Sequence, residues 1–198
     1  LLLGFESAEQ DVEPWMRAAL ACCADHGGTW ERRGEPGSGR VGSWREAFLR
    51  APYLRDTFVA IGVLSETFET AITWERFPSF HAAVLEHARA AVAEACGRGS
   101  VTCRFTHVYP DGPAPYYTIL APARRGAELE QWAQIKRAAS DAVLAAGGTI
   151  THHHAVGRDH RPWYDRQRPE PFARALRAAK AAVDPQGLLN PGVLIDPR

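Results

Sequence analysis

The sequence predicts an α+β fold in which helices cover one antiparallel β-sheet, followed by a helical C-terminal segment. Three observations support this prediction. Two β-like stretches, residues 101–109 and 116–120, flank the turn Pro110-Asp111-Gly112-Pro113, which is typical of a hairpin. Long Ala-rich stretches with helical spacing precede and follow that hairpin. No GxGxxG follows a predicted strand and no Walker motif occurs, so the chain has no recognisable nucleotide-binding loop of its own.

The composition limits the function classes. The 198 residues include 23 Lys+Arg and 23 Asp+Glu, and this zero net charge argues against binding to nucleic acid or to an anionic membrane surface. The 4 cysteines show no CxxC spacing, which favours a reduced, intracellular compartment and therefore a cytoplasmic location. The opening three leucines are too few to span a bilayer or to form a signal-peptide core.

In the N-terminal part, apolar periodicity alternates with glycine-rich breaks. Apolar residues recur at three- and four-residue steps in residues 8–26, which predicts an amphipathic helix that ends at Gly27 and Gly28. The elements expected around it are a strand at 1–5, a flexible loop at 32–42, a helix at 44–50 broken by Pro52, and a β-like stretch at 57–74.

The second part begins with a helix at 79–96 that Gly97 ends. In the strand 101–109 that follows, alternation places five side chains on one face: Val101, Cys103, Phe105, His107 and Tyr109. The remaining expected elements are the returning strand 116–120, a helix at 126–146, a strand at 149–156, helices at 161–168 and 171–183, and an extended tail from residue 184.

Three consecutive histidines, His152, His153 and His154, are the most distinctive feature. In a strand, the first and third would share a face and His153 would point the other way. The triplet has three interpretations: a solvated polar loop, a metal site, or acid–base chemistry beside a cofactor. We predict no metal, because no carboxylate or cysteine lies at ligand spacing from the triplet.

Two further features carry possible chemistry. Adjacent Tyr116 and Tyr117 must face opposite sides of a strand, so that one packs in the core while the other lines a cavity as an acid or hydrogen-bond donor; ordinary aromatic packing is the alternative. Arg55 has the planar fork that holds a carboxylate or phosphate, although a surface pair with Asp56 also explains it. The segment 66–70 is simply a strand.

Taken together, these features resemble the C-terminal half of the alkyldihydroxyacetonephosphate synthase family, which belongs to the vanillyl-alcohol oxidase type of FAD-linked oxidases. The similar stretches are Tyr53-Leu54-Arg55-Asp56, Glu66-Thr67-Phe68-Glu69-Thr70 with Trp74, Thr102-Cys103-Arg104 with Tyr109, Gly112 with Tyr116, Gly147-Gly148 followed by the His triplet and Gly157, and the closing segment 184–192. The His triplet in its context is the most specific of them.

The resemblance implies a two-domain flavoenzyme of which this chain is a fragment. Residues 1–157 would form a ferredoxin-like cap that binds a small-molecule or lipid-like substrate. Residues 158–198 would form a helical segment and a tail that returns to an N-terminal FAD-binding domain not included here. That domain would bind most of the FAD, with Asn190 in contact with the cofactor. Homodimers are common in the family.

The resemblance also implies site residues. Tyr116, His152, His153 and His154 would deprotonate acyl-dihydroxyacetone phosphate and assist loss of its acyl group, which a fatty alcohol then replaces. Arg55 would bind the substrate. If that substrate is lipid-like, the protein would be associated with membranes only through it. Departures at His107, Ala155 and the Asn190-Pro191-Gly192 segment favour an alternative, FAD-dependent dehydrogenation of a 2-hydroxy acid or alcohol. A third alternative is a non-catalytic metal- or ligand-binding module.

Overall fold

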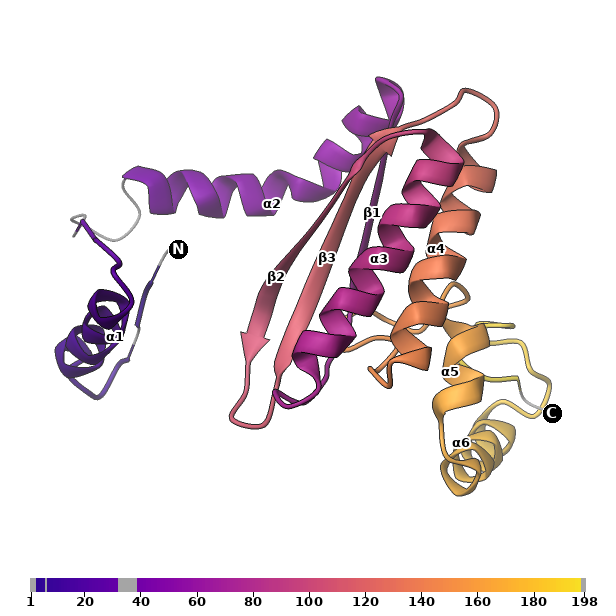
Figure 1. Cartoon of the computed structure of the whole chain (residues 1–198). Coiled ribbons are helices and arrows are strands. Elements are labelled where there is room, and N and C mark those ends of the chain that lie inside the picture. Colours follow the sequence, from indigo (N-terminus) through magenta and orange to yellow (C-terminus); the bar gives the residue numbers. More distant parts are fainter. Residues whose placement is uncertain (1–2, 6, 32–38, 197–198) are drawn as a thin grey trace. The chain divides into compact units, whose positions relative to one another are not determined.

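The structure is a computed structural model that describes residues 3–5, 7–31 and 39–196 (Figure 1). Its contacts divide the chain into two compact units, Leu1–Leu54 and Arg55–Arg198. In chain order the elements are α1 (Glu13–Asp25), α2 (Gly39–Ala60), β1 (Val63–Glu69), α3 (Phe77–Cys96), β2 (Ser100–Val108), β3 (Pro113–Pro122), α4 (Glu128–Ala145), α5 (Arg161–Gln167) and α6 (Glu170–Val183).

The first unit contains α1, which confirms the helix expected at residues 8–26 but begins later. The Asp11 carboxylate accepts a hydrogen bond from the Glu13 N–H (3.0 Å), and Pro14 occupies the first turn, where its missing N–H costs nothing. The strand expected at 1–5 is not formed over its described part, residues 3–5, and Leu1 and Leu2 lie outside the described residues. A strand requires a hydrogen-bonded neighbour, and the described part of this unit contains none.

Helix α2 corrects two expectations. It continues through Pro52 to Ala60, where a break was expected, and it includes the start of the β-like stretch expected at 57–74. A proline removes only one helical hydrogen bond, and β-branched residues disfavour a helix weakly, so neither need end a long helix. The helix ends where Gly62 adopts φ 84°, and β1 begins at the next residue.

The second unit is built on a three-stranded antiparallel sheet in the order β1-β3-β2. Helices α3 and α4 lie side by side along one face of it (Figure 1). The core consists of side chains from that face and from both helices, including Leu64, Phe68, Phe80, Val84, Tyr117, Ile119, Ile135 and Val143. This confirms the predicted α+β class with helices covering an antiparallel sheet.

A β-bulge in β2 changes which face His107 joins. Phe105 pairs with Pro115 and His107 with Ala114, so that Thr106 is an extra residue on this strand. The Phe105 ring packs against Phe77 of α3, on the helix side. His107 is instead turned to the opposite face, so the expectation that it shares a face with Phe105 is wrong. Strand alternation holds only while the register is unbroken.

The strand expected at 149–156 is also absent. Only Thr149 reaches the edge of the sheet, where its N–H donates to the Ala71 carbonyl (3.1 Å) and its hydroxyl oxygen accepts from the Ala71 N–H (2.9 Å). Beyond it, the Ile150 N–H donates to the Gln167 side chain (2.9 Å), and the Thr151 hydroxyl donates to the His154 carbonyl. These local partners replace a ladder and bend the chain. The order β1-α3-β2-β3-α4 is therefore a ferredoxin-like unit without its last strand in the described residues.

The C-terminal segment packs onto the same unit as the sheet. The Trp163 indole N–H donates to Asp141 of α4 (2.8 Å), and the Leu194 N–H donates to the Gly157 carbonyl (3.2 Å). The boundary between the two compact units therefore does not lie at residue 157. The expected division into a cap at 1–157 and a C-terminal segment at 158–198 stays a prediction. None of the described helices combines the length and the apolar character needed to cross a bilayer.

Candidate active site

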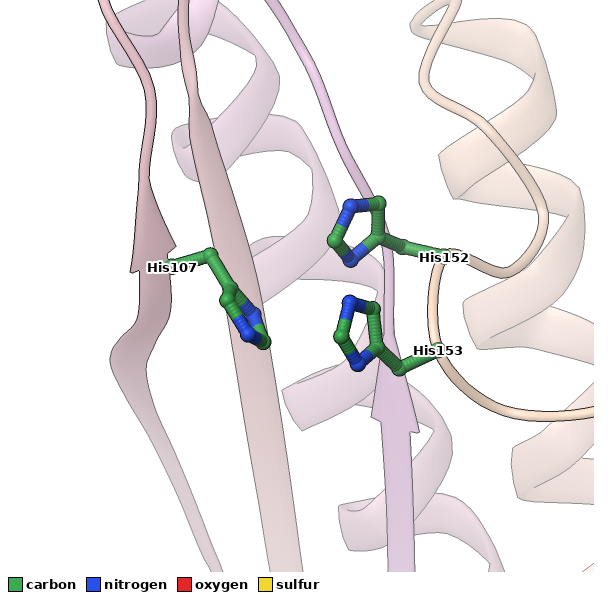
Figure 2. A group of neighbouring side chains, drawn as sticks. All are labelled: His107, His152 and His153. Atoms are coloured by element: carbon green, nitrogen blue, oxygen red, sulfur yellow. The ribbon is translucent and has the colours of Figure 1, made fainter.

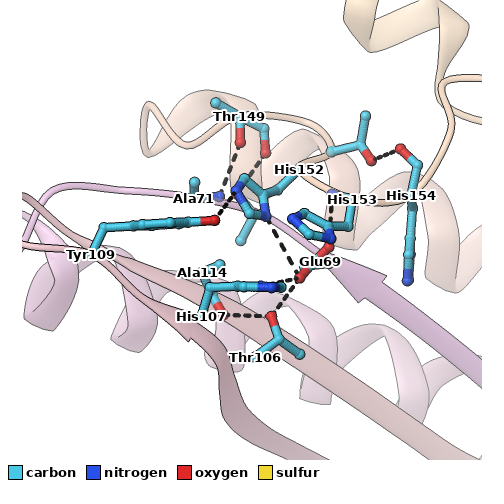
Figure 3. Close-up of polar contacts among 12 residues, drawn as sticks. Glu69, Ala71, Thr106, His107, Tyr109, Ala114, Thr149, His152, His153 and His154 are labelled. Atoms are coloured by element: carbon cyan, nitrogen blue, oxygen red, sulfur yellow. Dashed lines mark hydrogen bonds and ion pairs between the residues drawn. The ribbon is translucent and has the colours of Figure 1, made fainter. Parts of the chain in front are cut away.

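The candidate site lies on the face of the sheet opposite α3 and α4, and it is centred on Glu69 at the end of β1. This glutamate is only 3% exposed. Its carboxylate accepts a hydrogen bond from the His153 backbone N–H (2.8 Å) and another from the Thr106 hydroxyl. The carboxylate therefore connects the bulge of β2 to the bent segment 151–154, called the histidine loop below (Figure 3).

Three imidazoles surround this carboxylate. The ring centroids of His107 and His153 are 4.1 Å apart, and those of His152 and His153 are 4.4 Å apart. Figure 2 shows the three rings facing one another, one from β2 and two from the histidine loop. The Nδ1 atoms of His107 and His152 each lie 3.7 Å from Glu69 Oε1, and neither of these buried nitrogens has a hydrogen-bond partner among the residues that the structure describes.

The environment of Glu69 keeps it ionised. Burial raises its pKa, but the hydrogen bonds from Thr106 and the His153 N–H, together with the nearby His152 and His153 rings, outweigh burial. The net result is a pKa below the usual glutamate value. The cluster therefore holds a negative charge beside three imidazoles. Each imidazole nitrogen can either donate an N–H hydrogen bond or offer a lone pair.

A tyrosine completes this cluster. The Tyr109 hydroxyl lies 3.2 Å from His152 Nε2, and the Tyr109 ring stacks on that of His107 at 5.9 Å. The phenol therefore occupies Nε2 of His152, and the ring nitrogen that faces Glu69 is Nδ1, which has no partner among the described residues. The phenol therefore fixes the orientation of the ring.

The third histidine of the triplet belongs to a different group. The His154 ring meets that of Tyr116 edge to face at 5.4 Å, and the Arg104 guanidinium carbon lies 4.7 Å from the centroid of the Tyr116 ring. Arg104 and Tyr116 are direct cross-strand partners in the β2–β3 register. This arrangement places a phenol beside an imidazole and a cation.

The two adjacent tyrosines face opposite sides, as the sequence predicts. Tyr117 is fully buried on the helix side, where its ring stacks on Phe68 at 4.8 Å and its hydroxyl lies 3.0 Å from His81 Nδ1. Burial raises the pKa of Tyr117 far above its usual value, so this phenol stays protonated. Tyr116 is half-buried on the other face.

The expected pairing within the histidine triplet is wrong. The sequence places His152 and His154 on one face, whereas the structure stacks His152 on His153 and turns His154 to Tyr116. The alternation rule applies to a strand, and residues 152–154 form bends.

The structure does not bring Arg55 to the histidines. Arg55 lies in α2 and lines an apolar groove of about 270 Å³ together with Val59, Val63, Leu64, Ser65, Ala123, Glu128, Leu129 and Trp132. Val63 begins β1 and Glu69 ends it, so the groove and the histidine cluster lie at opposite ends of a strand about 20 Å long.

Asn190 lies in the C-terminal tail, exposed and with φ 48°. The tail is held by the Arg158 guanidinium, which donates to the Pro191 carbonyl (2.9 Å), and by the bond between Leu194 and Gly157. These bonds place the tail beside the loop that follows the triplet. The predicted contact of Asn190 with a cofactor stays a prediction.

Sequence reasoning missed five residues of the site: Glu69, Arg104, Thr106, His107 and Tyr109. The segment containing Glu69 was interpreted as a plain strand. The available signal was a glutamate at the end of a β-branched and aromatic run, three residues after Glu66. The bulge that brings in Thr106 and His107 had no signal in the sequence.

The comparison with known families identifies the chain. The profile of the family described as FAD linked oxidases, C-terminal domain, matches residues 1–194. The chain belongs to this family of FAD-linked oxidases. Among curated members, it is 35% identical over 150 residues to alkyldihydroxyacetonephosphate synthase of Caenorhabditis elegans, covering 73% of this chain and 25% of that protein. It is 30% identical over 153 residues to the synthase of Trypanosoma brucei brucei, covering 77% and 25%.

A protein with a different name from the synthases also matches. The glycolate oxidase subunit GlcD of Bacillus subtilis (strain 168) is 32% identical over 90 residues, covering 46% of this chain and 19% of that protein. Among solved structures, alkyldihydroxyacetonephosphate synthase in space group P1 superposes with a TM-score of 0.57 at 15% identity, covering 90% of this chain and 28% of that one. This likeness confirms the fold. The chain spans about a quarter of the length of the synthases it matches.

Proposed function

We propose that this chain is the substrate-covering cap of an FAD-dependent enzyme that exchanges the acyl group of acyl-dihydroxyacetone phosphate for an alkyl group. The observation that supports this most is the arrangement of Tyr116, His154 and Arg104 on the open face of the sheet. The family and the similarity to two synthases support the same reaction class.

The residues on this face fit a flavin. Arg104, Tyr116 and His154 offer cationic and hydrogen-bonding groups to a partner rich in oxygen and nitrogen acceptors. FAD, when bound, supplies an electrophilic ring that accepts electron density from substrate carbon. An N-terminal domain joined to this chain would bind most of the cofactor.

The chemistry that falls to this chain is proton transfer. A proton must leave the carbon beside the substrate carbonyl, and either the Tyr116 side-chain oxygen or the His154 imidazole is placed to accept it. Arg104, over the Tyr116 ring, stabilises the negative charge that develops on the substrate. His154, at the edge of the same ring, is placed to take up or return the proton.

Arg55 remains a candidate substrate ligand. The apolar residues of its groove suit the far end of a long acyl or alkyl chain, which can extend along β1 from the Tyr116 end, whereas the phosphate lies too close to the reacting carbon to reach Arg55. In this proposal Arg55 acts from the groove and not within the histidine cluster. We propose a cytoplasmic protein that meets membranes only through such a substrate.

The test uses the FAD-containing enzyme assembled from this chain and its FAD-binding domain, supplied with acyl-dihydroxyacetone phosphate and a fatty alcohol. Tyr116→Phe should lower kcat by about 100- to 10,000-fold, the usual range for loss of an acid–base group. Tyr117→Phe is the matched control and should retain most of the activity, because its phenol faces the helices. Unchanged turnover in Tyr116→Phe would reject the role given to Tyr116.

A second candidate is dehydrogenation of a 2-hydroxy acid, such as lactate or glycolate. The His107–His152–His153 cluster and the similarity to a glycolate oxidase subunit favour it. In this reaction an imidazole of the cluster accepts the hydroxyl proton while hydride leaves the carbon. Anaerobic bleaching of the flavin by a panel of 2-hydroxy acids distinguishes the two candidates, and an unchanged flavin spectrum with every acid would count against this one.

A further inference from the structure

The cluster formed by His107, His152, His153 and Glu69 has the composition of a metal site. It brings three imidazoles and one carboxylate together from β1, β2 and the histidine loop, three segments far apart in the sequence. One nitrogen of each imidazole lies within 4.8 Å of a nitrogen of the other two. Three nitrogens and one oxygen form the donor set that Zn²⁺ and similar transition ions prefer, whereas Mg²⁺ and Ca²⁺ prefer oxygen alone.

The distances to Glu69 agree with an ion between the groups better than with hydrogen bonds. The Nδ1 atoms of His107 and His152 both lie 3.7 Å from Glu69 Oε1, beyond hydrogen-bond range. An ion bound at about 2.0–2.1 Å to a nitrogen and to an oxygen, at a tetrahedral angle, holds those two atoms about 3.3–3.4 Å apart, so both pairs need to close by only a few tenths of an ångström. Both separations therefore suit a shared cation.

The two nitrogens are also unsatisfied without such an ion. Among the described side chains, His107 Nδ1 and His152 Nδ1 are the buried nitrogen or oxygen atoms that lack a hydrogen-bond partner. Buried polar atoms normally have partners, because an unpaired one costs about 1–3 kcal/mol. A metal ion would satisfy both nitrogens at once.

The groups around the cluster orient its ligands. The Tyr109 hydroxyl contacts Nε2 of His152, which leaves Nδ1 of that ring for a ligand. The Thr106 hydroxyl and the His153 N–H hold the Glu69 carboxylate in place. Hydrogen bonds of this kind to the far side of a metal ligand are a regular feature of metal sites.

We propose that His107, His152 and His153, with Glu69 as the fourth ligand, bind one divalent transition-metal ion of the Zn²⁺ type. This site goes beyond the proposed function, since its ligands are different residues from the proton-transfer group Tyr116–His154–Arg104, which lies next to it through the Glu69–Tyr116 cross-strand pair. It differs from our sequence prediction that no metal is bound, which stays a prediction. The sequence does not indicate this site because two of its ligands, Glu69 and His107, come from strands and are not at ligand spacing from the triplet.

The experiment measures metal binding by the 198-residue chain, free of any tag and stripped with a chelator. Co²⁺ titration followed by visible absorbance should give a tetrahedral spectrum that saturates at one ion per chain, and Zn²⁺ should displace it. Mg²⁺ and Ca²⁺ should not compete. The variants His107→Gln and His153→Gln should each weaken Zn²⁺ binding by at least about a hundredfold, the upper end of the losses measured for the surrounding groups of such sites.

His154→Gln is the matched control, because it removes a histidine of the same triplet that contacts Tyr116 and not the cluster. Its Zn²⁺ affinity should equal that of the unmodified chain. Circular dichroism of each variant verifies folding, and His153, whose side chain is exposed, provides a ligand variant if His107→Gln fails to fold. Absence of stoichiometric binding, or equal weakening by His154→Gln and the ligand variants, would overturn the proposal. Neither result bears on the Tyr116 test, so the two can fail separately.

Discussion

The buried carboxylate of Glu69 offers the sharpest test of how the site is held together. The perturbation is Glu69→Gln, which keeps the shape of the side chain and removes its charge. Glu69 accepts hydrogen bonds from the Thr106 hydroxyl and the His153 N–H. A glutamine has one oxygen for these two donors, so its NH₂ group must either face the His153 N–H, donor against donor, or face the Thr106 hydroxyl, which then donates to the Ala114 carbonyl alone (3.2 Å).

The magnitude follows from these two bonds. A hydrogen bond to a charged group contributes about 1.5–3 kcal/mol, and a buried donor left unsatisfied costs about 1–3 kcal/mol. Losing one bond and weakening the other should therefore lower the free energy of unfolding by about 2–4 kcal/mol. Thr106→Val, which removes only the hydroxyl donor, should cost about 1–2 kcal/mol. Glu86→Gln on the exposed surface of α3 is the control and should stay within about 0.5 kcal/mol.

The pH dependence has a definite sign. The folded-state pKa of Glu69 lies below its usual value, so at acidic pH the unfolded chain binds more protons at this site than the folded chain. The stabilisation by Glu69 is therefore complete above the ordinary glutamate pKa and is lost as the pH falls through the lowered folded-state value. The stability difference between the unmodified chain and Glu69→Gln should shrink over the same interval.

The assay is urea unfolding in the presence of a chelator, followed by circular dichroism and tryptophan fluorescence between pH 3 and pH 7. Agreement of the two probes verifies that the sheet unit unfolds as one cooperative transition. If Glu69→Gln unfolds at the same urea concentration as Glu86→Gln at neutral pH, the carboxylate does not hold the loop and the reasoning is refuted.

Four further predictions concern the fold and the cofactor. Lys136→Met should lower the free energy of unfolding by about 3–5 kcal/mol, because it leaves Glu66 charged and buried without its ion-pair partner 2.8 Å away. The double variant Glu66→Gln/Lys136→Met should be more stable to urea than Lys136→Met, and the opposite result would contradict this. Gly112→Ala should destabilise the hairpin by at least about 1–3 kcal/mol, since its new Cβ would lie 2.0 Å from the Ile72 carbonyl oxygen; a native urea midpoint would show that the hairpin can move. Burial lowers the pKa of His160, so the folded chain resists its protonation, and between pH 7 and pH 5 the unmodified chain should lose more stability than His160→Gln; parallel pH profiles would contradict this. The chain without an FAD-binding domain should be colourless and inactive, and a stoichiometric yellow chromophore in the purified chain would contradict this.

The sequence predicted the architecture better than the site because architecture depends on patterns that repeat along the chain. Helices α3, α4 and α6 carry helical spacing over many residues, and the hairpin has a proline- and glycine-rich turn between two alternating runs. Each of these signals sums over a whole element, so a single exception does not cancel it.

The errors occurred where one local feature overrides such a pattern. The bulge at Thr106 reverses the face of His107, and side-chain hydrogen bonds bend the histidine loop where alternation predicted a strand. Likewise, α2 passes through a proline that was expected to end a helix. These events depend on a few contacts and leave no periodic signal in the sequence.

By itself, the sequence determined the α+β class, the resemblance to FAD-linked oxidases, and the residue types available for chemistry, because composition and short-range spacing specify these. Only the tertiary structure decided how those residues are grouped. It separated His154 from His152 and His153, joined Glu69 and His107 to the latter pair, and left Arg55 at the far end of β1. The physical reason is that strand register, a one-residue bulge and a bent loop set distances between residues up to 84 positions apart, and local propensity carries no information about such distances.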